Sequence, residues 1–123
     1  MDELNSFTFH HREHLDWLNE LNFYQDQIKI LQNDLLAVLH KKADSLSIIE
    51  HLEEYRMILL KKLEIIDILR HQIILQEKIL STDLKLSSDL LWDHRELRMK
   101  VQEFEKEFDT MKQNLRRFAA YND

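Results

Sequence analysis

Residues 7–38 read FTFHHREHLDWLNELNFYQDQIKILQNDLLAV, and a row of mostly apolar side chains runs through them in alternating steps of three and four. That spacing brings about one side chain per turn to the same face of an α-helix. The row consists of Phe7, His10, His14, Trp17, Leu21, Tyr24, Ile28, Leu31, Leu35 and Val38. It predicts a long amphipathic helix whose core-facing side includes two histidines.

Two further rows follow a similar rule. In the middle of the chain, leucine or isoleucine recurs every seven residues at Leu52, Leu59, Ile66, Ile73 and Leu80. The last third again steps by three and four through Leu90, His94, Leu97, Val101, Phe104, Phe108, Met111, Leu115 and Phe118. We therefore expect three helices near residues 3–42, 46–80 and 84–119, each roughly 52–60 Å long. Their period of about 3.5 residues predicts coiled-coil-like packing.

Two short polar stretches separate the expected helices. Residues 40–45 contain Asp44 and Ser45, either of which can cap the next helix, while Ser47 offers a later start through a capping box. The second joint is a run of three capping residues that ends at Asp83. Because the chain has no glycine, we expect Asp44 and Asp83 to take the left-handed conformation at the turns. Such short connections force neighbouring helices to run antiparallel.

The composition independently favours an all-α fold. The 123 residues include no glycine, proline or cysteine, and 33% of them are charged and 44% apolar. Strand-rich folds depend on turns that favour glycine, whereas this mixture is typical of long amphipathic helices. A chain of this length can bury one core. The sequence thus predicts a single domain, residues 1–123, folded as an elongated, antiparallel up-down-up three-helix bundle.

Charge and composition also restrict the function. A net charge of −6 disfavours a nucleic-acid binder, whose affinity rests on neutralising phosphates. No apolar run approaches the roughly 18 residues of a membrane span, and the acidic N-terminus does not resemble a secretory signal. The absence of cysteine excludes thiolate catalysis and fits a cytoplasmic protein. Without a Gly-rich phosphate loop or a Ser-His-Asp signature, we expect a non-enzymatic protein that holds no cofactor.

Three histidines occupy core positions where the pattern calls for apolar residues. His10 and His14 lie four residues apart on one face of the first helix, and His94 belongs to the row of the third. Counting residues back from the turns brings His14 and His94 within about one helical turn of each other, near one end of the bundle. Glu77 lies level with His10, and a modest rotation of the middle helix would bring in His71. We therefore expect one shared polar layer.

Three interpretations of this layer follow from its chemistry. Hydrogen bonds within it could fix the register of the helices at some cost in stability. Alternatively, the three histidines, with Glu77 or His71, could bind a divalent metal such as zinc or iron, although no H-E-x-x-H or E-x-x-H pair accompanies them. Third, partly buried imidazoles would repel one another once charged at mildly acidic pH, which would make the layer a pH-sensitive switch.

A second apolar row on the middle helix lies roughly 60–150° around the helix axis from the first. It comprises Ile58, Ile65, Ile68, Leu75 and Ile79. A middle helix that touches two neighbours needs a broad apolar face, which is one interpretation of this row. The other is that part of it stays outside the core and is covered by a partner, because long exposed apolar stripes are rare on monomers. We expect that partner to be a second copy, in a homodimer, or another helical protein.

Overall fold

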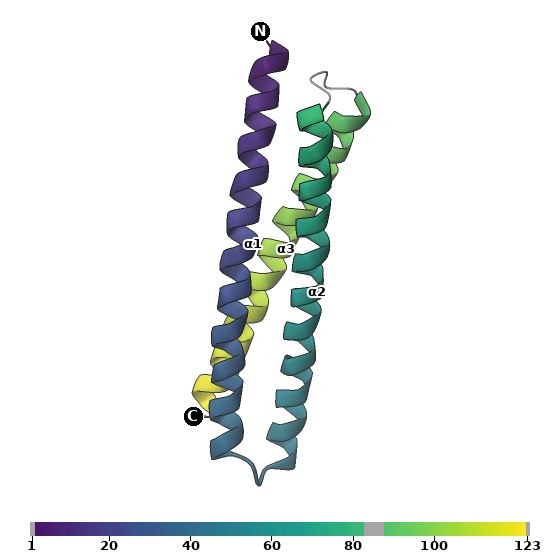
Figure 1. Cartoon of the computed structure of the whole chain (residues 1–123). Helices are drawn as coiled ribbons and strands as arrows, with labels where there is room; N and C mark the ends of the chain where they lie inside the picture. The colour runs from purple at the N-terminus through teal and green to yellow at the C-terminus, as the bar shows by residue number, and fades with distance from the viewer. Residues whose placement is uncertain (1, 83–87, 123) are drawn as a thin grey trace.

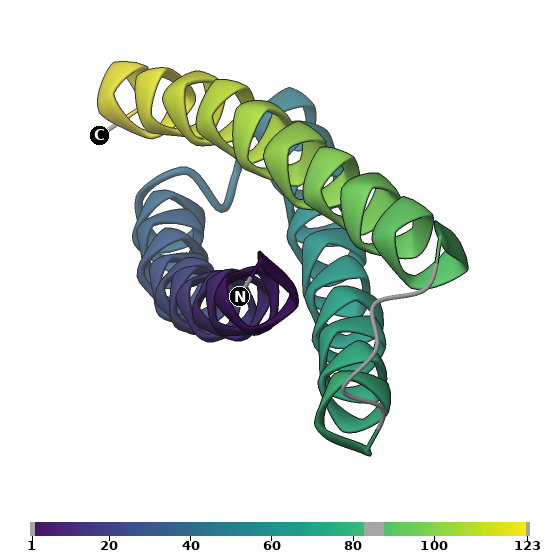
Figure 2. The same cartoon turned by 90° about the horizontal axis from the view of Figure 1, so that it is seen from above.

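The computed structural model describes residues 2–82 and 88–122. In this part of the chain three helices follow one another: α1 (Asp2–Lys41), α2 (Leu46–Thr82) and α3 (Ser88–Tyr121). α1 runs along the length of the molecule, α2 returns beside it, and α3 runs in the direction of α1 again (Figure 1). Seen from above, α3 crosses the other two helices obliquely (Figure 2). The predicted elongated, antiparallel three-helix bundle is confirmed.

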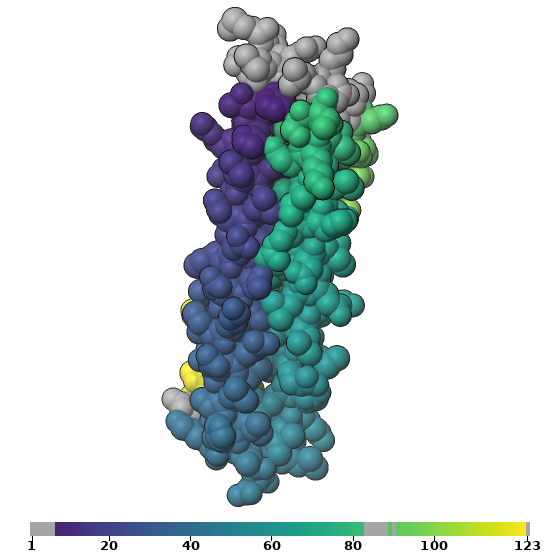
Figure 3. Space-filling model, viewed as in Figure 1, coloured from purple at the N-terminus to yellow at the C-terminus, as the bar shows by residue number. Residues whose placement is uncertain are grey.

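The core consists of the three predicted rows. Along α1, every row position from Trp17 to Val38 is buried except Tyr24, which is half-buried. The row of α3 is buried from Leu97 to Leu115. On α2 the buried side chains are Leu52, Leu59, Ile66, Leu69, Ile73 and Leu80. The burial of each large apolar side chain stabilises the fold by about 1.5–3 kcal/mol. The side chains of α1 and α2 pack closely along the length of the two helices (Figure 3).

The connection between α1 and α2 is built from ordinary residues. The Ser45 N–H donates to the carbonyl of Lys42 (3.1 Å), and the Ser45 hydroxyl accepts from the N–H of Ile48 (3.4 Å). Ser45 is therefore the residue that caps α2. No described residue has a positive φ, so the expected left-handed conformation of Asp44 is wrong. The second expected pivot, Asp83, lies outside the described residues.

α2 leaves most of its second apolar row outside the three-helix core. Ile68 and Leu75 retain 55% and 51% of their exposure, and Ile58 and Ile79 are also exposed. Only Ile65 is half-buried, packed against the core. Four of the five members of the row therefore lie outside the three-helix core, and whether a partner covers them stays a prediction. We call the five residues the outer row of α2.

Candidate functional site

The three core histidines meet near the end of the bundle that holds the start of α1. His10, His14 and His94 retain only 9%, 2% and 3% of their exposure. The centroid of the His94 ring lies 4.0 Å from that of His10 and 4.9 Å from that of His14. Trp17, the next member of the α1 row, stacks on His94 at 4.9 Å. The expected meeting of the histidines is confirmed, and we call the three residues the histidine layer.

Glu77 of α2 reaches this layer from one side. Its carboxylate accepts hydrogen bonds from Nδ1 of His14 (2.7 Å) and from Nδ1 of His11. The sequence placed Glu77 beside the layer correctly, but level with His10, and it did not predict the contact with His11. His11 is exposed and nevertheless binds the carboxylate. Burial alone would raise the pKa of Glu77, but the hydrogen bonds from His11 and His14 outweigh it and lower that pKa below its ordinary value.

Glu13 of α1 binds the layer from the other side. Its carboxylate accepts from Nε2 of His94 (2.7 Å) and takes two further hydrogen bonds from the guanidinium of Arg98, both 2.7 Å. Such a bidentate charged pair is among the stronger side-chain hydrogen-bonding arrangements. Burial would raise the pKa of Glu13, but the hydrogen bonds from Arg98 and His94 lower it below the ordinary value. A carboxylate thus connects α1 to α3 beside the buried rings.

Glu13 and Arg98 were not predicted from the sequence. Both stand at the edges of the apolar rows, next to His14 and one turn after His94, and not at core positions of those rows. A usable signal was present: His94 and Arg98 share one face of α3 at a spacing of four residues, and a carboxylate occupies the edge of the helix opposite. That signal could have nominated the pair before its geometry was known.

The hydrogen bonds determine which ring nitrogens carry protons. A carboxylate only accepts, so Nδ1 of His14 and Nε2 of His94 must both be donors. In the neutral rings the opposite nitrogens are then acceptors, and Nε2 of His14 is buried with no hydrogen-bond partner among the described residues. Burial, reinforced by the nearby His10 and His14, lowers the pKa of His94 to about 4, although its bond to Glu13 acts in the opposite direction. His94 is therefore a neutral imidazole at physiological pH.

The metal-binding interpretation finds less support in this geometry. Within residues 2–82 and 88–122, no group of three or more His, Cys, Asp or Glu side chains is arranged to hold a metal ion. His71, proposed as an alternative ligand, is exposed on α2 and does not join the layer. Both oxygens of Glu77 are already engaged by ring nitrogens. The contacts present are those of a hydrogen-bonded polar layer, and metal binding stays a prediction.

A second acidic contact joins α1 to α3 farther along the bundle. The carboxyl groups of Glu20 and Glu105 interact across the two helices. Burial, followed by this interaction with Glu20 and the charge of Asp109, raises the pKa of Glu105 to about 7. Burial and the same three carboxyl groups raise the pKa of Tyr24 to about 12. The sequence analysis did not foresee this pair.

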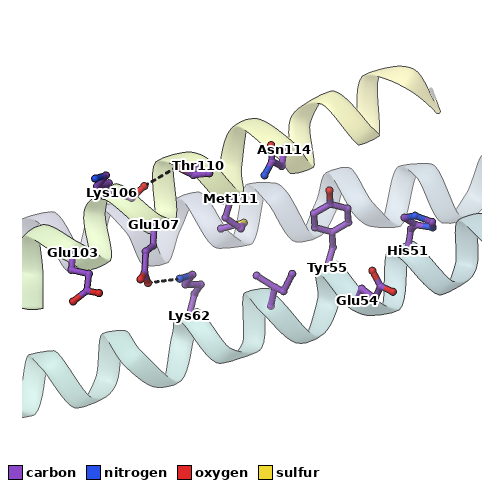
Figure 4. A pocket seen from close by; sticks show the side chains of 11 residues that line it. His51, Glu54, Tyr55, Lys62, Glu103, Lys106, Glu107, Thr110, Met111 and Asn114 are labelled. Atoms are coloured by element: carbon purple, nitrogen blue, oxygen red, sulfur yellow. Dashed lines mark hydrogen bonds and ion pairs between the residues drawn. The ribbon is translucent and has the colours of Figure 1, made fainter.

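The other notable feature is a groove between α2 and α3. Three adjoining hollows of about 700, 380 and 220 Å³ follow it. Every member of the outer row lines one of them: Ile58 the first, Ile65 and Ile68 the second, Leu75 and Ile79 the third. In the largest hollow, side chains from α2 and α3 face each other (Figure 4). We call this feature the α2–α3 groove.

The two walls of the groove differ in character. The α2 wall contains the outer row and is the more apolar of the two, although polar side chains such as Lys62 and Gln72 interrupt it. α3 contributes mostly charged side chains: Asp93, Glu96, Lys100, Glu103, Lys106 and Glu107. Lys62 connects the walls, since its ammonium lies 3.4 Å from a carboxylate oxygen of Glu107 (Figure 4). The same ammonium lies 5.6 Å from the centre of the Phe104 ring. An apolar wall beside a charged one suits an amphipathic helix, which has both kinds of face.

None of the helices in the described part of the chain is both long enough and apolar enough to span a membrane. A comparison with protein-family models, curated proteins and solved structures finds no match to this chain. The function is therefore argued from the chemistry of the histidine layer and of the α2–α3 groove.

Proposed function

We propose that this protein is a non-enzymatic helical bundle that acts through protein–protein contact, and that it associates with itself along the outer row of α2. The observation that carries the proposal is the exposure of this row along the α2–α3 groove. Four of its five side chains are exposed and all five line the groove. Contiguous apolar surface of this kind is typical of an interface.

The histidine layer has a structural role in this proposal. Glu77 connects α2 to α1, and Glu13 connects α1 to α3, so the layer ties all three helices at one level. A polar group at a core position fixes register because a slipped helix would leave that group without its partner. Correct register between α2 and α3 determines which side chains of α3 lie beside the outer row in the α2–α3 groove. The absence of cysteine fits the reducing cytoplasm, where we propose that the protein acts.

The test replaces one side chain of the outer row by a charge. Ile68→Glu places a carboxylate in the middle of the contact, so we expect it to convert a dimer into a monomer. Ile74→Glu is the matched control, because Ile74 lies on the same helix, is 42% exposed and lines none of the three hollows. Sedimentation equilibrium measures the mass of each variant, and thermal unfolding checks that each is folded.

The two variants separate the proposal from its alternatives. A dimeric Ile74→Glu variant beside a monomeric Ile68→Glu variant supports self-association through the outer row. If both variants keep the dimer mass, another face makes the contact and the proposal is wrong. If the unmodified chain is monomeric at all concentrations, self-association is wrong irrespective of the variants.

A further inference from the structure

The spacing of the outer row lets a second copy match it in the antiparallel direction as well as in the parallel one. From Ile58 to Leu75 its steps are seven, three and seven residues, a sequence that is the same from either end. An antiparallel second α2 would therefore set Leu75 opposite Ile58 and Ile68 opposite Ile65. Two-fold symmetric interfaces require this kind of self-complementary surface. The centre of this symmetric spacing lies between residues 66 and 67.

Two polar residues that lie beside the outer row on α2 are related by the same symmetry. Lys61 follows Ile58 by three residues, and Gln72 precedes Leu75 by three. An antiparallel copy sets Lys61 opposite Gln72, whereas a parallel copy would set Lys61 opposite Lys61, and two facing ammonium groups repel. The amide oxygen of Gln72 is buried and has no hydrogen-bond partner among the described residues. A rotation of the Gln72 side chain would let this oxygen accept from the Lys61 ammonium of the copy.

The charges at the edge of the stripe fit as well. Glu64 and His71 are both exposed. At about 100° per residue they lie on the edge of the outer row opposite to Lys62, whose ammonium contacts Glu107 of α3. In the antiparallel arrangement Glu64 of each chain lies near His71 of the other, so that the contact occurs twice. A carboxylate and an imidazole that face each other attract or form a hydrogen bond, whereas two facing carboxylates would repel.

We propose that the partner of the outer row is a second copy of this chain whose α2 packs antiparallel to the first about a two-fold axis level with residues 66 and 67. This inference rests on the proposed function and adds the orientation and the facing residues. Ile79 lies beyond the symmetric part of the row, at the end of the contact. Each α2 then fills part of the α2–α3 groove of the other copy.

Single cysteines test the orientation cleanly, because the chain has no cysteine of its own. Ile58→Cys and Leu75→Cys are purified separately, mixed, and treated with a short bifunctional maleimide. We expect a covalent product of two 15.1-kDa chains in the mixture and none with either variant alone. A mixture of Ile58→Cys with Ile74→Cys is the control and should give no such product.

Each other outcome has a separate meaning. If each variant forms the product alone, the dimer is parallel and the inference is wrong while the proposed function stands. If sedimentation shows a dimer but no combination is linked, the facing residues are wrong. If sedimentation shows a monomer, the proposed function itself fails.

A charge exchange gives a second readout that leaves the core untouched. Glu64→Lys removes two attractive contacts per dimer, and we expect the dissociation constant of the dimer to rise about fivefold. Adding His71→Glu restores an opposite-charge pair and should recover the original dissociation constant. Failure of the double variant to recover it would contradict the antiparallel pairing of these two residues.

Discussion

Lowering the pH from about 7 to about 4.5 should destabilise the bundle, and His94 should account for most of the loss. Burial, together with His10 and His14, lowers the pKa of His94 to about 4 in the folded chain, from an ordinary value of 6.5. The unfolded chain therefore binds a proton on this ring near pH 6.5, whereas the folded chain binds it only near pH 4. Between these two values the unfolded state holds more protons, so stability falls as the pH falls.

The size of the effect follows from the shift. One pKa unit corresponds to about 1.36 kcal/mol, so the full loss is about 3 kcal/mol, of which about 2.5 kcal/mol is lost by about pH 4.5. Glu13 and Glu77 have lowered pKa values, and their contributions are lost only below their ordinary value of 4.5. Glu105 acts in the opposite direction, because its raised pKa of about 7 makes acidification favourable between pH 7 and 4.5.

The assay therefore starts from a chain that carries Glu105→Gln, which removes the opposing titration. Urea unfolding followed by circular dichroism gives the free energy of unfolding at about pH 7 and about pH 4.5, at one fixed chain concentration because association raises apparent stability. We expect a loss of about 2–3 kcal/mol, falling to less than about 1 kcal/mol once His94→Leu is added. Equal losses with and without His94 would refute the reasoning.

Three further predictions concern the histidine layer, the acidic pair and the cap of α2. Replacing all three histidines of the layer by leucine should leave the melting temperature equal or higher. A chelator should not change the melting temperature of the unmodified chain, and a fall in that temperature would instead indicate a structural metal. Glu105→Gln should raise the free energy of unfolding by about 1 kcal/mol at about pH 8, after allowance for solvent screening, because it removes the repulsion from Glu20; no gain would contradict the paired carboxyl groups. Ser45→Ala should lower that free energy by about 1 kcal/mol in the same assay, and an unchanged value would show that Asp44 can cap α2 instead.

The fold was predictable because helical periodicity is a property of the sequence alone. The rows from Trp17 to Val38 and from Leu97 to Leu115 specify which faces are buried, and the short joints specify the antiparallel order. The turn conformation was not predictable in the same way. Asp44 tolerates a left-handed backbone, but Ser45 makes the turn with ordinary dihedral angles and one capping hydrogen bond.

The candidate site was predictable only in part, because its polar contacts depend on the rotation of each helix about its axis. Counting residues placed Glu77 beside the layer but level with His10, whereas its carboxylate binds His14 and His11. Glu77 joins the layer, whereas His71, about 120° away around the axis of α2, stays exposed. Glu13 was missed because a long side chain at the edge of a row can reach groups that its own helix position does not face.

The central claim, that the outer row of α2 is a self-association face, is tested most directly by the mass of the unmodified chain in solution. Sedimentation equilibrium over a wide concentration series at neutral pH gives this mass without substitution or labelling. Self-association predicts a weight-average mass that rises from that of one 15.1-kDa chain towards that of two. A mass that stays at 15.1 kDa at every concentration would contradict the claim.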